Sequence, residues 1–151
     1  MSKEKTTVAK IFEIRDRYFD LREEIDSEVN PDSDRNYLQQ LMDIRKELSC
    51  LNMDLARETG KYLRDFKFFK GSHEAGRFIK QGQLMEEGTK VTAAEAKAKQ
   101  ETAGDHQSLL QKEAIYASAK LILEQSNELL FSIKQDISII RDDYSSLSDR
   151  E

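Results

Sequence analysis

The densest group of side chains that could do chemistry lies in residues 61–80, where cations and aromatic rings are interleaved. This segment contains six Lys or Arg residues and two acidic residues, so its net charge is +4 while the rest of the chain carries −9. Five aromatic residues stand among the cations. The candidate partner or nucleic-acid contacts are Lys61, Arg64, Lys67, Phe68, Phe69, Lys70, Arg77 and Lys80.

Three alternatives account for this basic–aromatic segment. Cations that neutralise phosphates, beside rings that stack on bases, are the ingredients of a site for single-stranded nucleic acid. The same residue types make a hot spot for a protein partner, or an aromatic cluster packed inside the end of a helix. The total charge of −5 works against nucleic acid, so packing and a protein contact are favoured over DNA.

The other reactive residue types are few and scattered. His73 and His106 are 33 residues apart and neither has neighbours at ligand spacing. The single Cys50 forms no intramolecular disulfide and supplies no zinc site, and its place beside an apolar seam predicts a buried thiol. The sequence also lacks a Gly-rich phosphate loop and a nucleophile elbow. We therefore expect no metal, no cofactor and no enzymatic activity.

The elements that must position these residues are helices. Charged residues make up 35% of the 151 residues and hydrophobic ones only 38%, a balance typical of elongated helices with one buried stripe. The single proline is Pro31, and all six glycines fall within 60–104. Residues 1–29, 34–59 and 105–151 therefore contain no helix breaker.

Apolar residues in these stretches recur at alternating spacings of three and four, which predicts narrow coiled-coil seams. We predict one all-α domain over 1–151, an elongated antiparallel helical bundle or coiled-coil hairpin of three long helices. The helices are expected near 6–29, 33–70 and 92–143, with a partly helical connection at 71–91 and a frayed tail at 145–151. The seams consist of Ile11, Ile14, Tyr18, Leu21 and Ile25, then Tyr37, Leu41, Ile44, Leu48, Leu51 and Leu55.

The third helix carries two seams that differ in register. The first consists of Leu110, Ala114, Ala117 and Leu121, and the second consists of Leu130, Ile133, Ile137, Ile140, Tyr144 and Leu147. The offset across 124–128 indicates a stutter in the heptad pattern. Thr92 and Glu95 have the spacing of a capping box, and Gly104 is the expected kink.

Two segments of the third helix resemble a loose group of small phage-encoded coiled-coil proteins. Residues 92–99 read Thr-Ala-Ala-Glu-Ala-Lys-Ala-Lys, and residues 129–141 match that group's C-terminal helix, with Ile140-Arg141 in place of its usual Leu-Lys. Members of the group are often encoded beside recombination genes. The resemblance covers residues 90–143 and implies a phage or mobile-element origin, with no catalytic residue to carry over.

We therefore expect a non-enzymatic, phage-encoded protein that occupies or inhibits a host or phage protein, such as a nuclease or a defence complex. The alternative is an accessory factor of phage recombination or replication that contacts single-stranded DNA through 61–80. A structural spacer is a third class. A homodimer is expected because narrow seams bury little in a monomer and two-fold symmetry is the commonest solution.

The expected location is the cytoplasm, the host cytoplasm if the protein is viral. No apolar run is long enough to span a bilayer, and residues 1–5 lack the apolar core of a secretory signal behind them.

Overall fold

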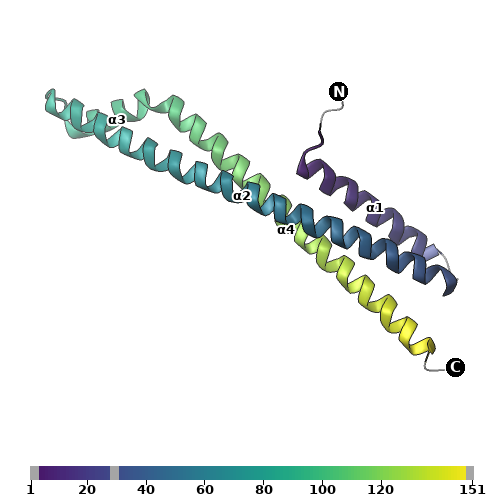
Figure 1. Cartoon of the computed structure of the whole chain (residues 1–151). Helices are drawn as coiled ribbons and strands as arrows, with labels where there is room; N and C mark the ends of the chain where they lie inside the picture. The colour runs from purple at the N-terminus through teal and green to yellow at the C-terminus, as the bar shows by residue number, and fades with distance from the viewer. Residues whose placement is uncertain (1–3, 28–30, 149–151) are drawn as a thin grey trace. The chain divides into compact units, whose positions relative to one another are not determined.

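The computed structural model describes residues 4–27 and 31–148, and this part of the chain is all-α. Its helices are α1 (Thr7–Ser27), α2 (Pro31–Glu86), α3 (Val91–Glu101) and α4 (Ala103–Ser148) (Figure 1). The all-α prediction is confirmed. The prediction of three long helices is wrong, because the described residues form four.

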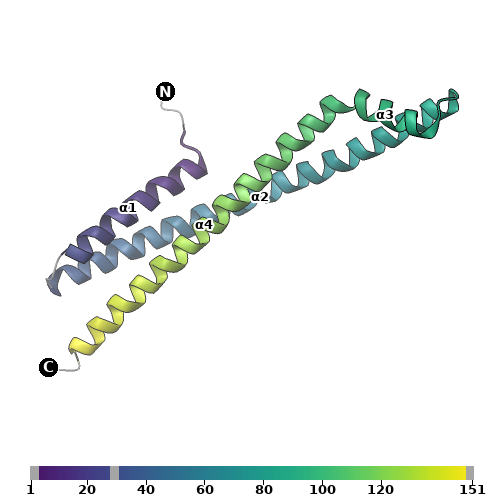
Figure 2. The same cartoon turned by 180° about the vertical axis from the view of Figure 1, so that it is seen from behind.

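The chain divides into two compact units. Unit 1 comprises Met1–Arg57 and Leu121–Glu151, and unit 2 comprises Glu58–Lys120. Helices α2 and α4 contribute to both units, whereas α1 belongs to unit 1 and α3 to unit 2 (Figure 2). By sequence, unit 2 holds 11 basic and 9 acidic residues, a net charge of +2, which leaves −7 for unit 1.

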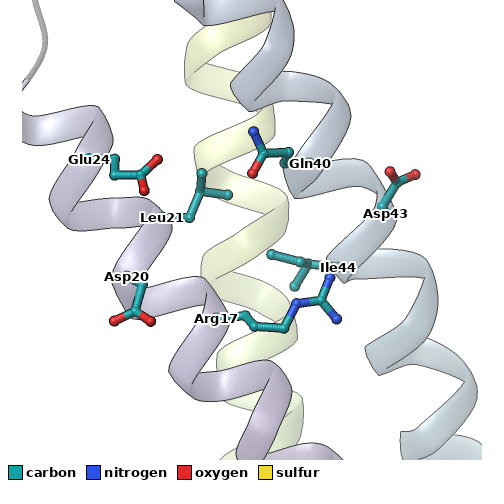
Figure 3. Close-up of a pocket in the computed structure, with 7 residues that line it drawn as sticks. All are labelled: Arg17, Asp20, Leu21, Glu24, Gln40, Asp43 and Ile44. Atoms are coloured by element: carbon teal, nitrogen blue, oxygen red, sulfur yellow. The ribbon is translucent and has the colours of Figure 1, made fainter.

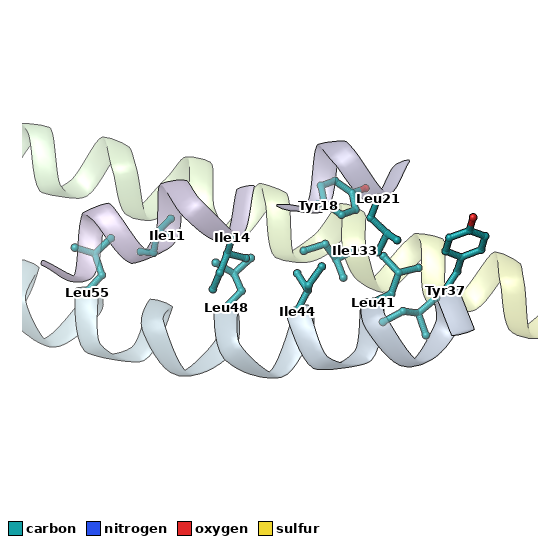
Figure 4. Close-up of a cluster of buried hydrophobic side chains, with 11 residues drawn as sticks. Ile11, Ile14, Tyr18, Leu21, Tyr37, Leu41, Ile44, Leu48, Leu55 and Ile133 are labelled. Carbon is teal, nitrogen blue, oxygen red and sulfur yellow. The ribbon is translucent and has the colours of Figure 1, made fainter. Parts of the chain in front are cut away.

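The core of unit 1 is built from the predicted seams of α1, α2 and α4. Figure 4 shows Ile11 of α1 near Leu55 of α2 and Leu21 of α1 near Leu41 of α2, so the two helices run antiparallel. The buried cluster consists of Ile11, Ile14, Tyr18, Leu21, Tyr37, Leu41, Ile44, Leu48, Leu55, Ile133 and Ile137. Within unit 1 the seams of α1, α2 and α4 pack against one another. The homodimer was expected because seams would stay uncovered in a monomer, and unit 1 gives no support to that reason.

Helix α2 passes through the glycines that were expected to interrupt it. The predicted end near Lys70 is wrong, because regular helix continues to Glu86. Residues 71–91 are partly helical as predicted, but the non-helical part is confined to 87–90 between α2 and α3. A helical Gly costs about 1 kcal/mol relative to Ala, which packing and hydrogen bonds of a long helix can offset. Gly71, Gly76 and Gly82 accordingly keep helical geometry.

Gly88 is the glycine that ends α2. Its φ is +92°, in the left-handed region that favours glycine. The Gly88 N–H donates to the Met85 carbonyl and the Thr89 N–H to the Leu84 carbonyl, both at 3.0 Å. These two bonds form a Schellman motif, which satisfies carbonyls that the helix end leaves without partners.

The predicted third helix is divided near its expected kink. The break lies at Thr102, two residues before Gly104, and the Thr102 hydroxyl donates to the Ala98 carbonyl at 2.7 Å. The capping box is absent: α3 begins at Val91 after Lys90, which makes no side-chain cap, and Glu95 pairs instead with Lys99 at 3.2 Å. Helix α4 continues to Ser148, so residues 145–148 of the predicted frayed tail are helical; the remainder, 149–151, lies outside the described residues.

Unit 2 has a thinner core than unit 1. Its buried residues are Thr59, His73, Leu84, Ala94, Ala98, Leu109 and Ala119. The predicted seam of Leu110, Ala114, Ala117 and Leu121 is exposed throughout, because α4 turns a different face towards α2 at these positions. No helix in the described part of the chain is long and apolar enough to cross a membrane.

Candidate functional site

Residues 61–80 lie entirely on the part of α2 that belongs to unit 2, so helix geometry fixes where each cation and ring is placed. Phe68 is 78% exposed. Arg64 precedes it by about one helical turn and Lys61 by about two, which aligns the three side chains on one face. Lys67 is its exposed neighbour. We call Lys61, Arg64, Lys67 and Phe68 the Phe68 surface.

Two of the other rings are used for packing instead. Phe66 stacks on Tyr116 of α4, with centroids 6.4 Å apart and ring planes 8° from parallel. Phe69 is half-buried, and the Lys112 ammonium lies 5.5 Å from its centroid. These contacts join α2 to α4 within unit 2. Phe69 was a candidate contact residue, but its ring is only partly available to a ligand.

The remaining candidate cations do not form one patch with the Phe68 surface. Lys70 is exposed but is turned away from Phe68 by the helix, two residues and about 200° further on. Arg77 is half-buried with its guanidinium 5.6 Å from the Phe78 centroid, and Lys80 pairs with Glu101 of α3 at 3.2 Å. Of the predicted contact residues, Lys61, Arg64, Lys67 and Phe68 therefore remain as the candidate site, which is the Phe68 surface.

The structure brings together two histidines that sequence reasoning kept apart. The rings of His73 on α2 and His106 on α4 have centroids 5.8 Å apart. His73 is buried, and its Nδ1 has no hydrogen-bond partner among the described residues. The burial of His73 could have been predicted from a seven-residue repeat on α2. Asn52, Thr59 and His73 in this repeat are buried, and Phe66 is half-buried.

Unit 1 contains a partly buried polar cluster that ties α1 to α4. The Tyr18 hydroxyl donates to Asp136, whose other carboxylate oxygen pairs with Arg22 Nη1 at 2.5 Å. Burial and the bond to Asp136 raise the pKa of Tyr18 well above its ordinary range. A phenol with a raised pKa keeps its proton at neutral pH, so this tyrosine is suited to holding the helices together rather than to acting as a base.

A groove between α1 and α2 of unit 1 gathers charged side chains above an apolar floor. Figure 3 shows Leu21 and Ile44 between the two helices, with Asp20 and Glu24 on α1 and Asp43 on α2. Arg17 at the same groove pairs with Glu47 at 3.0 Å. The described residues contain no group of three or more side chains that could hold a metal ion.

Cys50 lies on α2 near this groove and is exposed, so the prediction of a buried thiol is wrong. It follows the buried Leu48 by two residues, and two residues turn a helix by about 200°. The thiol therefore lies outside the buried row that contains Leu48, and it lines an open hollow together with Ile14 and Leu51.

Comparison of the chain with protein-family models, with curated proteins and with solved structures gives no match. The functional argument therefore depends on the geometry of the side chains described above.

Proposed function

We propose that this chain is a non-enzymatic protein-binding protein and that the Phe68 surface is its contact with a partner protein. The observation that carries the proposal is the Phe68 ring, 78% exposed on a regular helix beside three exposed cations. Aromatic and Arg side chains are the residue types most enriched at binding hot spots. A ring left in water, with Arg64 one turn away, is thus well suited to anchoring a partner.

The charge around the ring defines the kind of partner. Lys61, Arg64 and Lys67 form no ion pair within the described part of the chain. A partner surface with an apolar centre for Phe68 and acidic residues at its rim would match them. In keeping with the phage resemblance, the proposed partner is a host or phage protein, such as a nuclease or a defence complex, that binding occupies or inhibits.

Single-stranded DNA is the second candidate, favoured by the same exposed cations. Binding of successive bases uses successive exposed rings. Here Phe66 is stacked on Tyr116 and Phe69 is half-buried near Lys112. The other exposed rings of the segment, Tyr62 and Phe78, lie about 120° and about 80° around α2 from Phe68, so they do not continue its face. One exposed ring among cations on a helix face is more typical of a protein hot spot than of a surface on which successive bases stack. We therefore favour a protein partner over single-stranded DNA.

Photo-crosslinking from position 68 tests the proposal. Phe68→p-benzoylphenylalanine keeps an aromatic ring at the site and forms a covalent adduct with whatever protein touches it. Met53→p-benzoylphenylalanine is the matched control, because Met53 is 61% exposed on the same helix in unit 1. The experiment uses extract of the cells in which the gene is expressed.

We expect a discrete protein adduct from position 68 that is weak or missing from position 53. Adding Arg64→Glu and Lys67→Glu to the position-68 variant should remove the adduct, because reversed charges repel an acidic rim. Equal labelling from both positions, or no adduct from position 68, would count against the proposal.

A further inference from the structure

Unit 2 contains a pair of histidines that α2 and α4 bring together. His73 and His106 are the two histidines of the chain, and their ring centroids are 5.8 Å apart with the ring planes tilted by 37°. Both residues belong to unit 2, so the pair lies within one compact unit. The expectation of no metal was based on spacing along the chain, whereas metal sites in helical bundles take their ligands from facing helices.

The His73 side of the pair contains a nitrogen that needs a partner. His73 is only 9% exposed, and its Nδ1 has no hydrogen-bond partner among the described residues. Buried polar atoms in native proteins are nearly always partnered, because an unpartnered one is destabilising. His106 is exposed, so an ion from solvent can reach the pair from the His106 side.

We propose that His73 and His106 together bind one divalent transition-metal ion of the kind that Zn²⁺ represents. Imidazole nitrogen is a preferred ligand of zinc, copper and nickel, whereas magnesium and calcium prefer oxygen. With metal–nitrogen distances of about 2.0–2.1 Å, two imidazoles on one tetrahedral ion have ring centroids about 5–6 Å apart. The observed separation of 5.8 Å lies in this range. An ion held at His73 Nδ1 also gives that nitrogen the partner it lacks.

The site has two protein ligands. No third His, Cys, Asp or Glu joins the pair within the described part of the chain, so water completes the coordination of the ion. Because the two ligands come from α2 and α4, the bound ion links these helices across the thin core of unit 2. An ion that binds the folded chain better than the unfolded chain stabilises the fold.

Isothermal titration of the full chain with ZnCl₂ tests the site. We expect one Zn²⁺ per chain with an affinity in the micromolar range, and no such binding of Mg²⁺. His73→Gln and His106→Gln should each weaken Zn²⁺ binding by about 10-fold or more, because losing even a hydrogen-bond partner of a metal ligand has an effect of that size. Cys50→Ser is the matched control, since it removes the other side chain of the chain that zinc favours, and it should leave binding unchanged.

Two further measurements guard against loss of binding through misfolding. NMR spectra of the imidazole groups contain signals from two histidines, and Zn²⁺ should shift both signals at the same molar ratio. Circular dichroism should show intact helix for His106→Gln, because His106 is exposed. Zn²⁺ should raise the thermal midpoint of wild type and leave that of His106→Gln unchanged. Phe68→Ala should bind Zn²⁺ as wild type does, so this proposal is tested separately from the Phe68 surface.

Several results would overturn the proposal. They are a chain that binds no Zn²⁺, binding that survives in a folded His106→Gln variant, and binding that is lost in Cys50→Ser. A ratio of one Zn²⁺ to two chains would also contradict it, because the ion would then join two copies instead of α2 and α4 of one chain.

Discussion

The hydroxyl of Ser126 on α4 donates a hydrogen bond to the side-chain oxygen of Asn52 on α2, and both residues are buried in unit 1. The Asn52 amide in turn donates to the Asn127 side-chain oxygen at 3.1 Å. The α4 members of this layer, Ser126 and Asn127, lie within residues 124–128, where the two predicted seams of α4 fall out of register. A buried polar layer with satisfied partners fixes how two helices align, because a shift along the seam would leave its groups unpaired.

Removing one partner from this layer should destabilise the protein. Asn52→Ala leaves the Ser126 hydroxyl buried without its acceptor, so we expect a loss of about 1–3 kcal/mol in the free energy of unfolding. Ser126→Ala should also cost stability, and the two changes together should cost less than the sum of both. Urea denaturation measures all three, with the exposed Met53→Ala as a control within about ±0.5 kcal/mol. Full additivity would contradict the coupling.

The second prediction compares the loss of stability on substitution at buried heptad positions with the loss at exposed ones. Leu48→Ala and Ile137→Ala should each cost about 2–5 kcal/mol, because both side chains are buried in the unit 1 core. Leu110→Ala and the surface change Glu86→Ala should cost much less at concentrations where the chain is monomeric. Equal losses at Leu48 and Leu110 would show that the exposed assignment of Leu110 is wrong.

The heptad pattern could predict that Ile11, Leu48 and Ile137 are buried, because in unit 1 the seams pack on one another. It could not predict that Leu110 and Leu121 are exposed. A heptad shows that one side of a helix is apolar but does not identify what covers that side. For α4 the question is decided by which residues face α2, and Lys112 and Tyr116 do so through Phe69 and Phe66.

The extent of α2 was beyond sequence reasoning for a related reason. Gly71, Gly76 and Gly82 weaken a helix without ending it, and only Gly88 has the left-handed backbone of a helix stop. The sequence predicted that the candidate site lies within residues 61–80. It did not predict which of these side chains pack within the chain and which stay exposed. Spacing alone did not show that Phe66 packs on Tyr116 while Phe68 stays in water.

Alkaline titration should reveal the buried Tyr18. Because burial and the bond to Asp136 raise its pKa above the ordinary value of about 10, the folded chain holds the phenolic proton where the unfolded chain loses it. The stability that this contributes is present below pH 10 and should decline as the pH rises above it. Urea midpoints of wild type and Tyr18→Phe should therefore differ in their slope against pH in this range. Parallel slopes would contradict the assignment.

Single-stranded DNA should not bind to the Phe68 surface with useful affinity. A site that neutralised phosphates would show affinity falling with salt, with a slope of about −0.7 for each phosphate contact. Fluorescence anisotropy of a labelled oligonucleotide at low salt, where long-range attraction is least screened, is the sensitive measurement. A micromolar complex that weakens with salt and with Phe68→Ala would promote the DNA-binding alternative over the protein partner.

The most direct test of the Phe68 surface uses the partner protein captured by crosslinking at position 68. The measurement is the affinity with which this partner binds the unlabelled wild-type chain and its variants. Surface plasmon resonance should give Phe68→Ala at least about 30-fold weaker binding than wild type, the loss expected of a hot spot worth about 2 kcal/mol. Met53→Ala should bind as wild type does. If Phe68→Ala binds the partner with undiminished affinity, the claim that this ring anchors a protein partner is wrong.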